Sequence, residues 1–334
     1  MNRNVLLEVK NLKKYFPIRG GGIVGKKITN HVRAVDDVSF QVYEGESFGV
    51  VGESGCGKST TGRVILRLLD PTSGTVYFQG KNLAEVSEKE MRMLRKDIQI
   101  IFQDPFASLN PRMRVKHIIE EPLVNFNIVQ GKENIRKKVE EIAEQVGLTK
   151  KQIERYPHEF SGGQRQRIGI ARALASKPKL IIADEPVSAL DVSIQSQVLN
   201  LLTRLQKEHG FTFIFISHDL SVVKHFCDRI CVMYLGQIVE VANKNDLYKE
   251  PLHPYSQALL SAIPKPDPKL KKERIILTGD VPSPSNPPSG CPFHPRCAFA
   301  MDVCRKIRPR LKEQDDGRSI ACHLYDSELS QNVI

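Results

Sequence analysis

Long apolar runs are missing from this sequence. No stretch of about 18 consecutive apolar residues occurs, so no transmembrane helix is expected. The N-terminus, MNRNVLLEVKNLKK, turns to charged residues too soon for a secretory signal. Both absences predict a cytosolic chain, in which thiols stay reduced and structural disulfides are rare. The seven cysteines therefore need another explanation, and four of them lie from Cys291 to Cys322.

Internal repeats and sustained heptads are also missing, and only one phosphate-loop pattern occurs. At 334 residues the chain exceeds one average domain, which predicts one large domain with a smaller appendage. Apolar residues make up 40% and charged residues 26%, as in ordinary globular proteins. The net charge of +11 suits nucleic acid, nucleotide phosphates or an anionic membrane surface, and equally a solubilising surface charge.

Short apolar segments alternate with helical ones from about residue 5 to residue 245, which predicts an α/β domain over residues 1–245 with a sheet between helices. Three apolar runs are typical of buried parallel strands: Ser47–Val51, Leu180–Ala183 and Thr212–Ile216. A helical insert is expected at about residues 104–178. Prolines cluster after residue 245, so residues 246–334 are predicted to be irregular, either a disordered tail or a small fold that needs a staple.

A glycine-rich segment, Gly52–Thr60, fits the phosphate-loop pattern G-x-x-x-x-G-K-[ST] between an apolar run and a helical run. Its glycines let successive backbone N–H groups point at phosphate oxygens, and the following helix adds its positive N-terminal end. Lys58 is expected to reach the β- and γ-phosphates, and the Ser59 hydroxyl to bind Mg²⁺. The residues expected to bind nucleotide here are Gly52, Ser54, Gly55, Cys56, Gly57, Lys58, Ser59 and Thr60.

Two adjacent carboxylates follow the apolar run Leu180–Ala183. Asp184 is placed to hold Mg²⁺, usually through water. Glu185 can orient or deprotonate an attacking water. An Asp–Glu pair after a strand also occurs in ordinary turns, but with a phosphate loop upstream it favours a nucleotide-hydrolysing site.

The segment Phe160–Arg167, FSGGQRQR, lies between these two sites. A serine and two glycines at a helix N-terminus form a second anion site. With this segment the chain resembles the ATP-binding cassette (ABC) family, whose signature is Ser-Gly-Gly-Gln at a helix start. The resemblance spans about residues 5–245 and implies a P-loop NTPase fold with a RecA-like core, an antiparallel β subdomain and a helical subdomain. The signature residues expected to bind nucleotide are Ser161, Gly162, Gly163 and Gln164.

The resemblance also implies a catalytic set. Gln103 matches the glutamine that contacts Mg²⁺ and water and faces the membrane partner. The implied Mg²⁺ ligands are thus Ser59, Gln103 and Asp184. His218 matches the histidine that contacts the γ-phosphate and steadies Glu185. Glu185, His218 and Gln103 are therefore the expected catalytic residues.

Two further matches to the family concern the interface between two ATPase domains and the binding of the adenine ring. Asp191 belongs to Ser188–Asp191, which is similar to the loop that crosses the dimer interface. Phe16 matches the aromatic residue that stacks on adenine, with Tyr15 as an alternative. The resemblance implies that two such domains meet head to tail. Each ATP then lies between the phosphate loop of one subunit and the signature of the other, where Ser161 and Gly163 hold its γ-phosphate.

The tail resembles the C-terminal region of oligopeptide and dipeptide importers through His253–Tyr255, Ala258–Leu260 and Ile263-Pro264. The segment Glu185–Asp191 is more similar to the F-type ATPase subunit of these importers than to its D-type companion. The implied partners are a second, D-type ATPase subunit or a second copy of this chain, two transmembrane permease subunits and an external peptide-binding protein. The chain would then lie at the cytoplasmic face of the membrane. Related systems carry nickel, glutathione or oligosaccharides, so the cargo stays open.

Cys291, Cys297, Cys304 and Cys322 are spaced C-x5-C-x6-C-x17-C. Four thiolates in a proline-rich segment too small for its own core indicate a metal staple. The lack of a C-x-x-C pair argues against a common zinc ribbon, whereas four thiolates also suit a [4Fe–4S] cluster. The resemblance implies such a cluster in some members. The iron–sulfur hypothesis is favoured, and zinc or free, redox-active thiols stay open.

Two other functions are compatible with parts of the sequence. The charge of +11 suits a cassette ATPase acting on nucleic acid or ribosomes. Such proteins usually carry two cassettes or long coiled coils, so no nucleic-acid partner is expected. The cysteines suit a redox or metal sensor. The favoured function is an ATPase that powers import of dipeptides or oligopeptides with ATP and Mg²⁺.

Overall fold

The computed structural model describes residues 4–20, 28–263 and 274–326. Within them the chain forms two compact units. The first gathers the chain up to Leu6, Val42–Ser47 and Glu85–Ser217. The second gathers Leu7–Gln41, Phe48–Ala84 and the chain from His218 onward. Pro264 of the importer-type tail lies outside the described residues.

The first unit contains three parallel strands in the order β6 (Ile98–Ile101), β7 (Leu180–Asp184) and β8 (Thr212–Ser217). All residues of β7 and β8 are buried, and most of them are apolar, as expected of strands inside a parallel sheet. The predicted strands at these two places are confirmed. Asp184 closes β7, so the first carboxylate of the Asp–Glu pair still belongs to the sheet.

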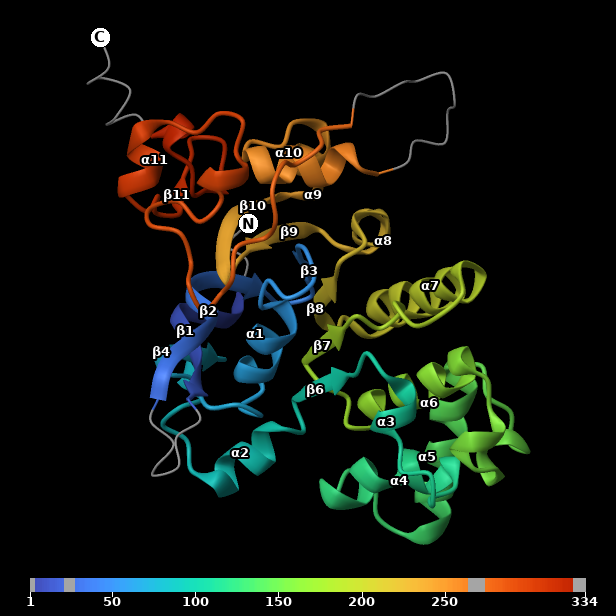
Figure 1. The fold of residues 1–334 in the computed structure, drawn as a ribbon. Coiled ribbons are helices and arrows are strands. Elements are labelled where there is room, and N and C mark those ends of the chain that lie inside the picture. The colour runs from blue at the N-terminus through green and yellow to red at the C-terminus, as the bar shows by residue number, and fades with distance from the viewer. Residues whose placement is uncertain (1–3, 21–27, 264–273, 327–334) are drawn as a thin grey trace, which may run out of the picture. The chain divides into compact units, whose positions relative to one another are not determined.

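Helices make up the rest of the first unit. α4 packs against both α5 and α6, and α3 also packs against α6; these four helices form the green cluster of Figure 1. Apolar residues at helical spacing, such as Val139, Ile142 and Ala143, form the buried face of α5. The helices of this unit are α2 (Glu88–Leu94), α3 (Pro105–Ser108), α4 (Val115–Asn125), α5 (Lys132–Gln145), α6 (Gly162–Ala175) and α7 (Val192–His209), with 3₁₀ turns η1 (Gln152–Glu154) and η2 (Pro157–Glu159).

The second unit contains an antiparallel sheet and part of the parallel one. The antiparallel sheet has the order β2-β1-β4-β5, formed by β1 (Val5–Arg19), β2 (Ile28–Tyr43), β4 (Ser73–Phe78) and β5 (Lys81–Asn82). Strand β3 (Ser47–Val51), another predicted strand, pairs in parallel with β9 (Arg229–Tyr234). Strand β10 (Gln237–Asn243) continues antiparallel from β9. The helices of this unit are α1 (Lys58–Ile65), α8 (Leu220–Phe226), α9 (Lys244–Lys249), α10 (Pro254–Ser261) and α11 (Asp302–Lys306).

Residues 274–326, which we call the cysteine appendage, are folded. Their regular elements are short, as the proline density predicted: besides α11 they are η3 (His294–Arg296), β11 (Lys312–Glu313), β12 (Ser319–Ile320) and η4 (His323–Tyr325). Strand β12 pairs antiparallel with β10, and β11 pairs with β12. Of the two sequence-based alternatives for this region, the small fold is correct for its described residues and the disordered tail is wrong.

Aromatic rings join the appendage to the rest of the second unit. Phe293 meets Tyr234 of β9 edge-on at 5.2 Å between ring centroids, and Tyr255 of α10 at 5.4 Å. All three rings are almost fully buried. The buried Glu240 of β10 accepts the N–H groups of Leu252 and His253 at 2.9 and 3.0 Å. The appendage thus packs on a preformed apolar surface instead of a core of its own.

Among the described residues, no helix combines the length and the apolar character needed to cross a membrane.

Candidate functional site

The phosphate loop, Gly52–Thr60, joins β3 to α1. Its turn requires glycine: Gly57 has a φ of +102°, and a Cβ there would lie 2.0 Å from the carbonyl oxygen of Ala34. Lys58 is buried, and its ammonium group donates to the carbonyls of Gly52 at 2.9 Å and Glu53 at 3.0 Å. The lysine therefore lies folded over its own loop, with a positive charge where phosphate oxygens are expected.

Two other predicted loop residues have distinct environments. The thiol of Cys56 is buried 3.8 Å from the Lys58 ammonium, and burial raises its pKa, so it is a neutral packing group. Ser59 and Thr60 follow Lys58 in the first turn of α1. Their position at a helix N-terminus is the expected one for binding an anion.

The first unit brings Gln103 and Glu185 together. Gln103 follows β6, and its side-chain amide donates to the Glu185 carboxylate at 3.2 Å. The backbone N–H of Glu185 donates to Ile216 of the neighbouring strand, which fixes the residue at the carboxyl end of β7. Glu185 has a φ of +46°, a left-handed conformation that non-glycine residues rarely adopt.

Asp184, one residue earlier, is 2% exposed. His218, the third residue of the predicted catalytic set, follows β8 and belongs to the second unit, as do Lys58 and Ser59.

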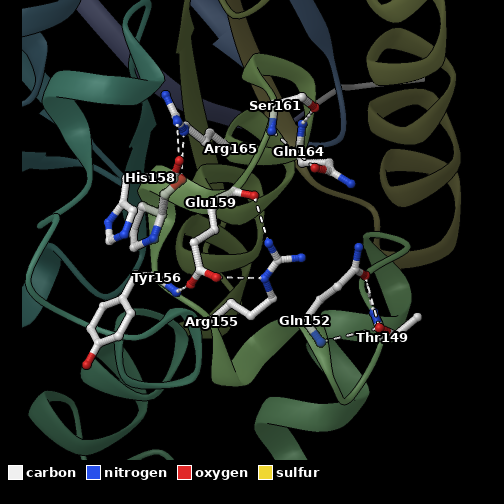
Figure 2. Close-up of polar contacts among 10 residues, drawn as sticks. Thr149, Gln152, Arg155, Tyr156, His158, Glu159, Ser161, Gln164 and Arg165 are labelled. Carbon is white, nitrogen blue, oxygen red and sulfur yellow. Dashed lines mark hydrogen bonds and ion pairs between the residues drawn. The ribbon is translucent and has the colours of Figure 1, made fainter.

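The signature segment begins α6 with a reciprocal cap, shown in Figure 2. Ser161 accepts the N–H of Gln164, and the Gln164 side chain accepts the N–H of Ser161 at 3.1 Å. At Gly163 a Cβ would lie 2.3 Å from Ile194 of α7, so only glycine lets the two helices approach this closely. Asp191 precedes α7 as its N-cap residue without a capping side-chain bond.

Arg165 was missed by sequence reasoning, although it follows the signature directly. Its buried guanidinium donates to the carbonyls of Pro157 and His158 at 2.7 and 3.1 Å, as Figure 2 shows for His158. It also lies 3.5 Å from the ring centroid of Phe106 in α3, a cation–π contact. The ring of Phe106 is 61% exposed, so the arginine holds an apolar side chain in solvent just beyond Gln103.

The two candidate adenine-stacking residues differ in their contacts. The Tyr15 hydroxyl donates to Asp36, and burial followed by this hydrogen bond raises the pKa of Tyr15 to about 12. Phe16 is 36% exposed, and the Lys14 ammonium lies over its ring, at 5.1 Å from the centroid. The geometry leaves Phe16 as the more accessible of the two rings.

The four clustered cysteines all line one small cavity of about 10 Å³, next to Phe299. Burial raises the pKa of Cys291 to about 11 and that of Cys322 to about 12, so both thiols are protonated. The neighbouring His294 and His323 bond to the carbonyls of Cys291 and Ile307. Within the described ranges, no three His, Cys, Asp or Glu side chains already have the geometry that holds a metal ion.

Comparison with protein families and with known proteins agrees with this geometry. The ABC transporter family matches residues 35–188, and the oligopeptide/dipeptide transporter C-terminal region matches residues 239–304. The putative oligopeptide transport ATP-binding protein YkfD of Bacillus subtilis is 58% identical over 100% of both chains. The oligopeptide transport ATP-binding protein OppF of Escherichia coli is 53% identical over 97% of both. The dipeptide transport ATP-binding protein DppF of Haemophilus influenzae is 50% identical over 96% of this chain and 97% of its own.

Solved structures give the same assignment. A dimeric ATP-binding cassette, MJ0796, bound to ADP and Pi superimposes with a TM-score of 0.63 at 30% identity, over 71% of this chain and 98% of that one. The cbiO1 structure from Clostridium perfringens also reaches a TM-score of 0.63 at 30% identity, over 74% of this chain and 92% of its own. The predicted ABC-type nucleotide-binding fold is thus confirmed. The chain belongs to the ABC transporter family, among its oligopeptide and dipeptide transport ATP-binding proteins.

Proposed function

We propose that this chain binds and hydrolyses ATP to power the import of oligopeptides or dipeptides across a membrane. The observation that carries the proposal is the hydrogen bond between Gln103 and Glu185 at the end of β7. The same chain has a phosphate loop whose Lys58 ammonium binds the carbonyl of Gly52. The full-length similarity to peptide-transport ATP-binding proteins supports the cargo class. A cassette acting on nucleic acid finds no support among these relatives.

The proposed catalytic residues have different roles. On ATP binding, Lys58 exchanges the carbonyls of Gly52 and Glu53 for phosphate oxygens, because a full charge binds phosphate more strongly than a peptide carbonyl. Glu185 accepts a proton from, or orients, the attacking water, while Gln103 keeps its carboxylate in place. His218 is proposed to contact the γ-phosphate.

Mg²⁺ suits the oxygen donors of this site. The hydroxyl of Ser59, the buried carboxylate of Asp184 and the amide oxygen of Gln103 are hard ligands of the kind that Mg²⁺ prefers. When bound, the ion neutralises phosphate charge. The remaining nucleotide contacts are assigned to the phosphate-loop backbone, and the adenine to Phe16.

A second subunit completes the proposed site. The cap of α6 leaves the helix N-terminus at Ser161–Gly163 as a surface for the γ-phosphate of an ATP held by the partner. The partner is a D-type ATPase subunit or a second copy of this chain, and Asp191 lies at their interface. Two permease subunits, with an external peptide-binding protein, complete an importer in which this chain is peripheral, at the cytoplasmic face of the membrane.

We also propose that Cys291, Cys297, Cys304 and Cys322 hold a [4Fe–4S] cluster as a staple of the appendage, with zinc as the alternative. The donor set supports this, since four thiols and no carboxylate line one cavity. A cavity of about 10 Å³ holds at most one water, so the loops that carry the thiols must open to take four irons.

Glu185→Gln and Lys58→Ala test the ATPase assignment in the intact chain. Glu185→Gln should keep ATP affinity but reduce turnover by at least about a hundredfold, and leave an ATP-dependent dimer on size-exclusion chromatography. Lys58→Ala should abolish ATP binding. Unchanged turnover in the first variant, or unchanged affinity in the second, would refute the proposed site.

The cluster is tested on anaerobically purified protein by iron and zinc analysis and by visible absorption. Cys297→Ser should lose the metal, whereas Cys227→Ala, which removes a buried thiol outside the set, should keep it. A protein that contains neither iron nor zinc would refute the proposed metal site.

A further inference from the structure

Glu53, the second residue of the phosphate loop, is held at three points. Its N–H donates to the Tyr255 hydroxyl at 2.9 Å, and its carbonyl accepts the Lys58 ammonium at 3.0 Å. Its carboxylate receives both terminal nitrogens of Arg296, at 3.0 and 3.3 Å. Two of these three attachments come from residues more than 200 positions later in the chain, in α10 and in the cysteine appendage.

The Arg296–Glu53 pair is mostly removed from water. The side chain of Arg296 is 8% exposed and that of Glu53 is 28% exposed. The guanidinium packs beside Tyr234, with 5.9 Å to the ring centroid, and its Nε is buried without a hydrogen-bond partner. Burying an arginine with one donor unsatisfied is unfavourable unless its charge is compensated. The bidentate contact with Glu53 provides that compensation.

The carboxylate of Glu53 belongs to the loop that is to receive a polyphosphate. An unpaired negative charge there would repel the nucleotide, and the repulsion would be strong because the surroundings are partly buried. Arg296 cancels this charge and draws the carboxylate toward the appendage. With the charge of Glu53 cancelled by Arg296, the positive charge of Lys58 remains available to attract the phosphates.

We propose that Arg296 is a positioning residue of the nucleotide site, which neutralises and orients Glu53 so that the phosphate loop binds ATP tightly. This inference rests on the proposed ATP site. Arg296 lies in η3 immediately before Cys297, whose thiol shares a cavity with the other three clustered cysteines. A change in the fold of the appendage would therefore alter the contact between Arg296 and Glu53 in the phosphate loop.

The test is a double-mutant cycle on the full-length chain, with affinities for ATP and ADP measured by titration of a fluorescent nucleotide in the presence of Mg²⁺. Arg296→Ala should weaken ATP binding by about tenfold or more. The loss should be smaller for ADP, which carries less charge. Glu53→Gln in the Arg296→Ala background should restore most of the ATP affinity, because it removes the uncompensated charge.

Arg296→Lys should fall between the natural chain and Arg296→Ala, since lysine keeps the charge but loses the bidentate contact. Arg310→Ala, a change of an exposed arginine in the same appendage, is the matched control and should leave affinity unchanged. If Arg296 only supported the fold, the double variant would bind ATP as weakly as Arg296→Ala, and ATP and ADP would lose equally. Either result, or an unchanged affinity in Arg296→Ala, overturns the inference.

Lys58→Ala separates the two proposals. If it leaves ATP affinity unchanged, the proposed ATP site itself is wrong. If it abolishes binding while Arg296→Ala does not weaken it, only the role of Arg296 is wrong.

Discussion

Strands β7 and β8 and the cysteine appendage are ordered by different interactions. All residues of β7 and β8 are buried, and their backbones pair in register from Leu180 with Thr212 to Asp184 with Ile216. In the appendage, β11 and β12 have two residues each, and the contacts to the rest of the unit include the ring of Phe293 and the guanidinium of Arg296. The first region is held by continuous apolar burial, and the second by a few long-range contacts.

This difference indicates how each region responds to damage. A fault in the buried strands removes apolar contacts from the centre of a unit and should affect all of it. A fault in the appendage should leave the buried strands intact. Its expected effects are limited to the elements that the appendage contacts, which include the phosphate loop through Arg296 and Glu53. Substitutions in the two regions should therefore differ in how far their effects spread.

Phe215→Ala in β8 should lower the free energy of unfolding by about 3–5 kcal/mol, because it leaves a cavity at a fully buried position. Urea denaturation measures this change. Phe293→Ala, at an equally buried ring of the appendage, should instead accelerate amide exchange of α10 and the appendage while β8 stays protected. Met93→Ala on the surface of α2 should neither lower the free energy of unfolding appreciably nor accelerate amide exchange. Equal loss of protection in β8 in the Phe293 variant would contradict the contrast.

Acid should loosen the α10–appendage region before the buried strands. Burial lowers the pKa of His253 from 6.5 to about 3, and its neutral Nδ1 accepts the N–H of Tyr255. The folded chain thus binds a proton here less tightly than the unfolded chain, and the stability that depends on neutral His253 is lost as pH falls below 6.5. The expected loss is about 1 kcal/mol per pH unit.

Amide exchange of α10 measured at several pH values checks this expectation. His253→Asn keeps a capping side chain without the titration and should flatten the pH dependence. Glu240 is also buried beside this helix, and burial raises its pKa. Its contribution to stability therefore increases as pH falls, opposite to that of His253. A pH dependence that persists in the His253 variant would assign the effect to another group.

Ser161→Ala should have the smallest effect on folding, about 1 kcal/mol, through loss of the cap of α6. Ser87→Ala removes an equivalent reciprocal cap from α2 and is the matched control. Both variants should lose similar stability in urea, but only Ser161→Ala should reduce ATP turnover. Equal turnover in the two variants would confine Ser161 to a structural role.

The sequence predicted the parts of the molecule that local patterns encode. Strands β3, β7 and β8 lie where apolar runs were found, and the helix after Ser161 begins at its cap. The phosphate loop was recognisable because its glycines are required by the backbone itself, as at Gly57. The roles of Phe16 and His218 in nucleotide binding stay predictions.

The long-range contacts were not predictable. Glu53 and Arg296 are 243 positions apart, and nothing in the periodicity around either residue links them. The pairing of β12 with β10 is equally hidden, because a two-residue strand has no pattern. In the sequence, Arg296 is distinguished only by its place next to Cys297, and this does not identify a partner.

Strand β12 has one more consequence, for truncated forms of the chain. By pairing with β10 at Glu240 and Val241, it covers backbone groups that would otherwise form an open sheet edge. Open edges invite the addition of strands from other molecules. A protein cut back to the cassette would therefore expose this edge of β10 to strand addition by other molecules, which the pairing with β12 blocks.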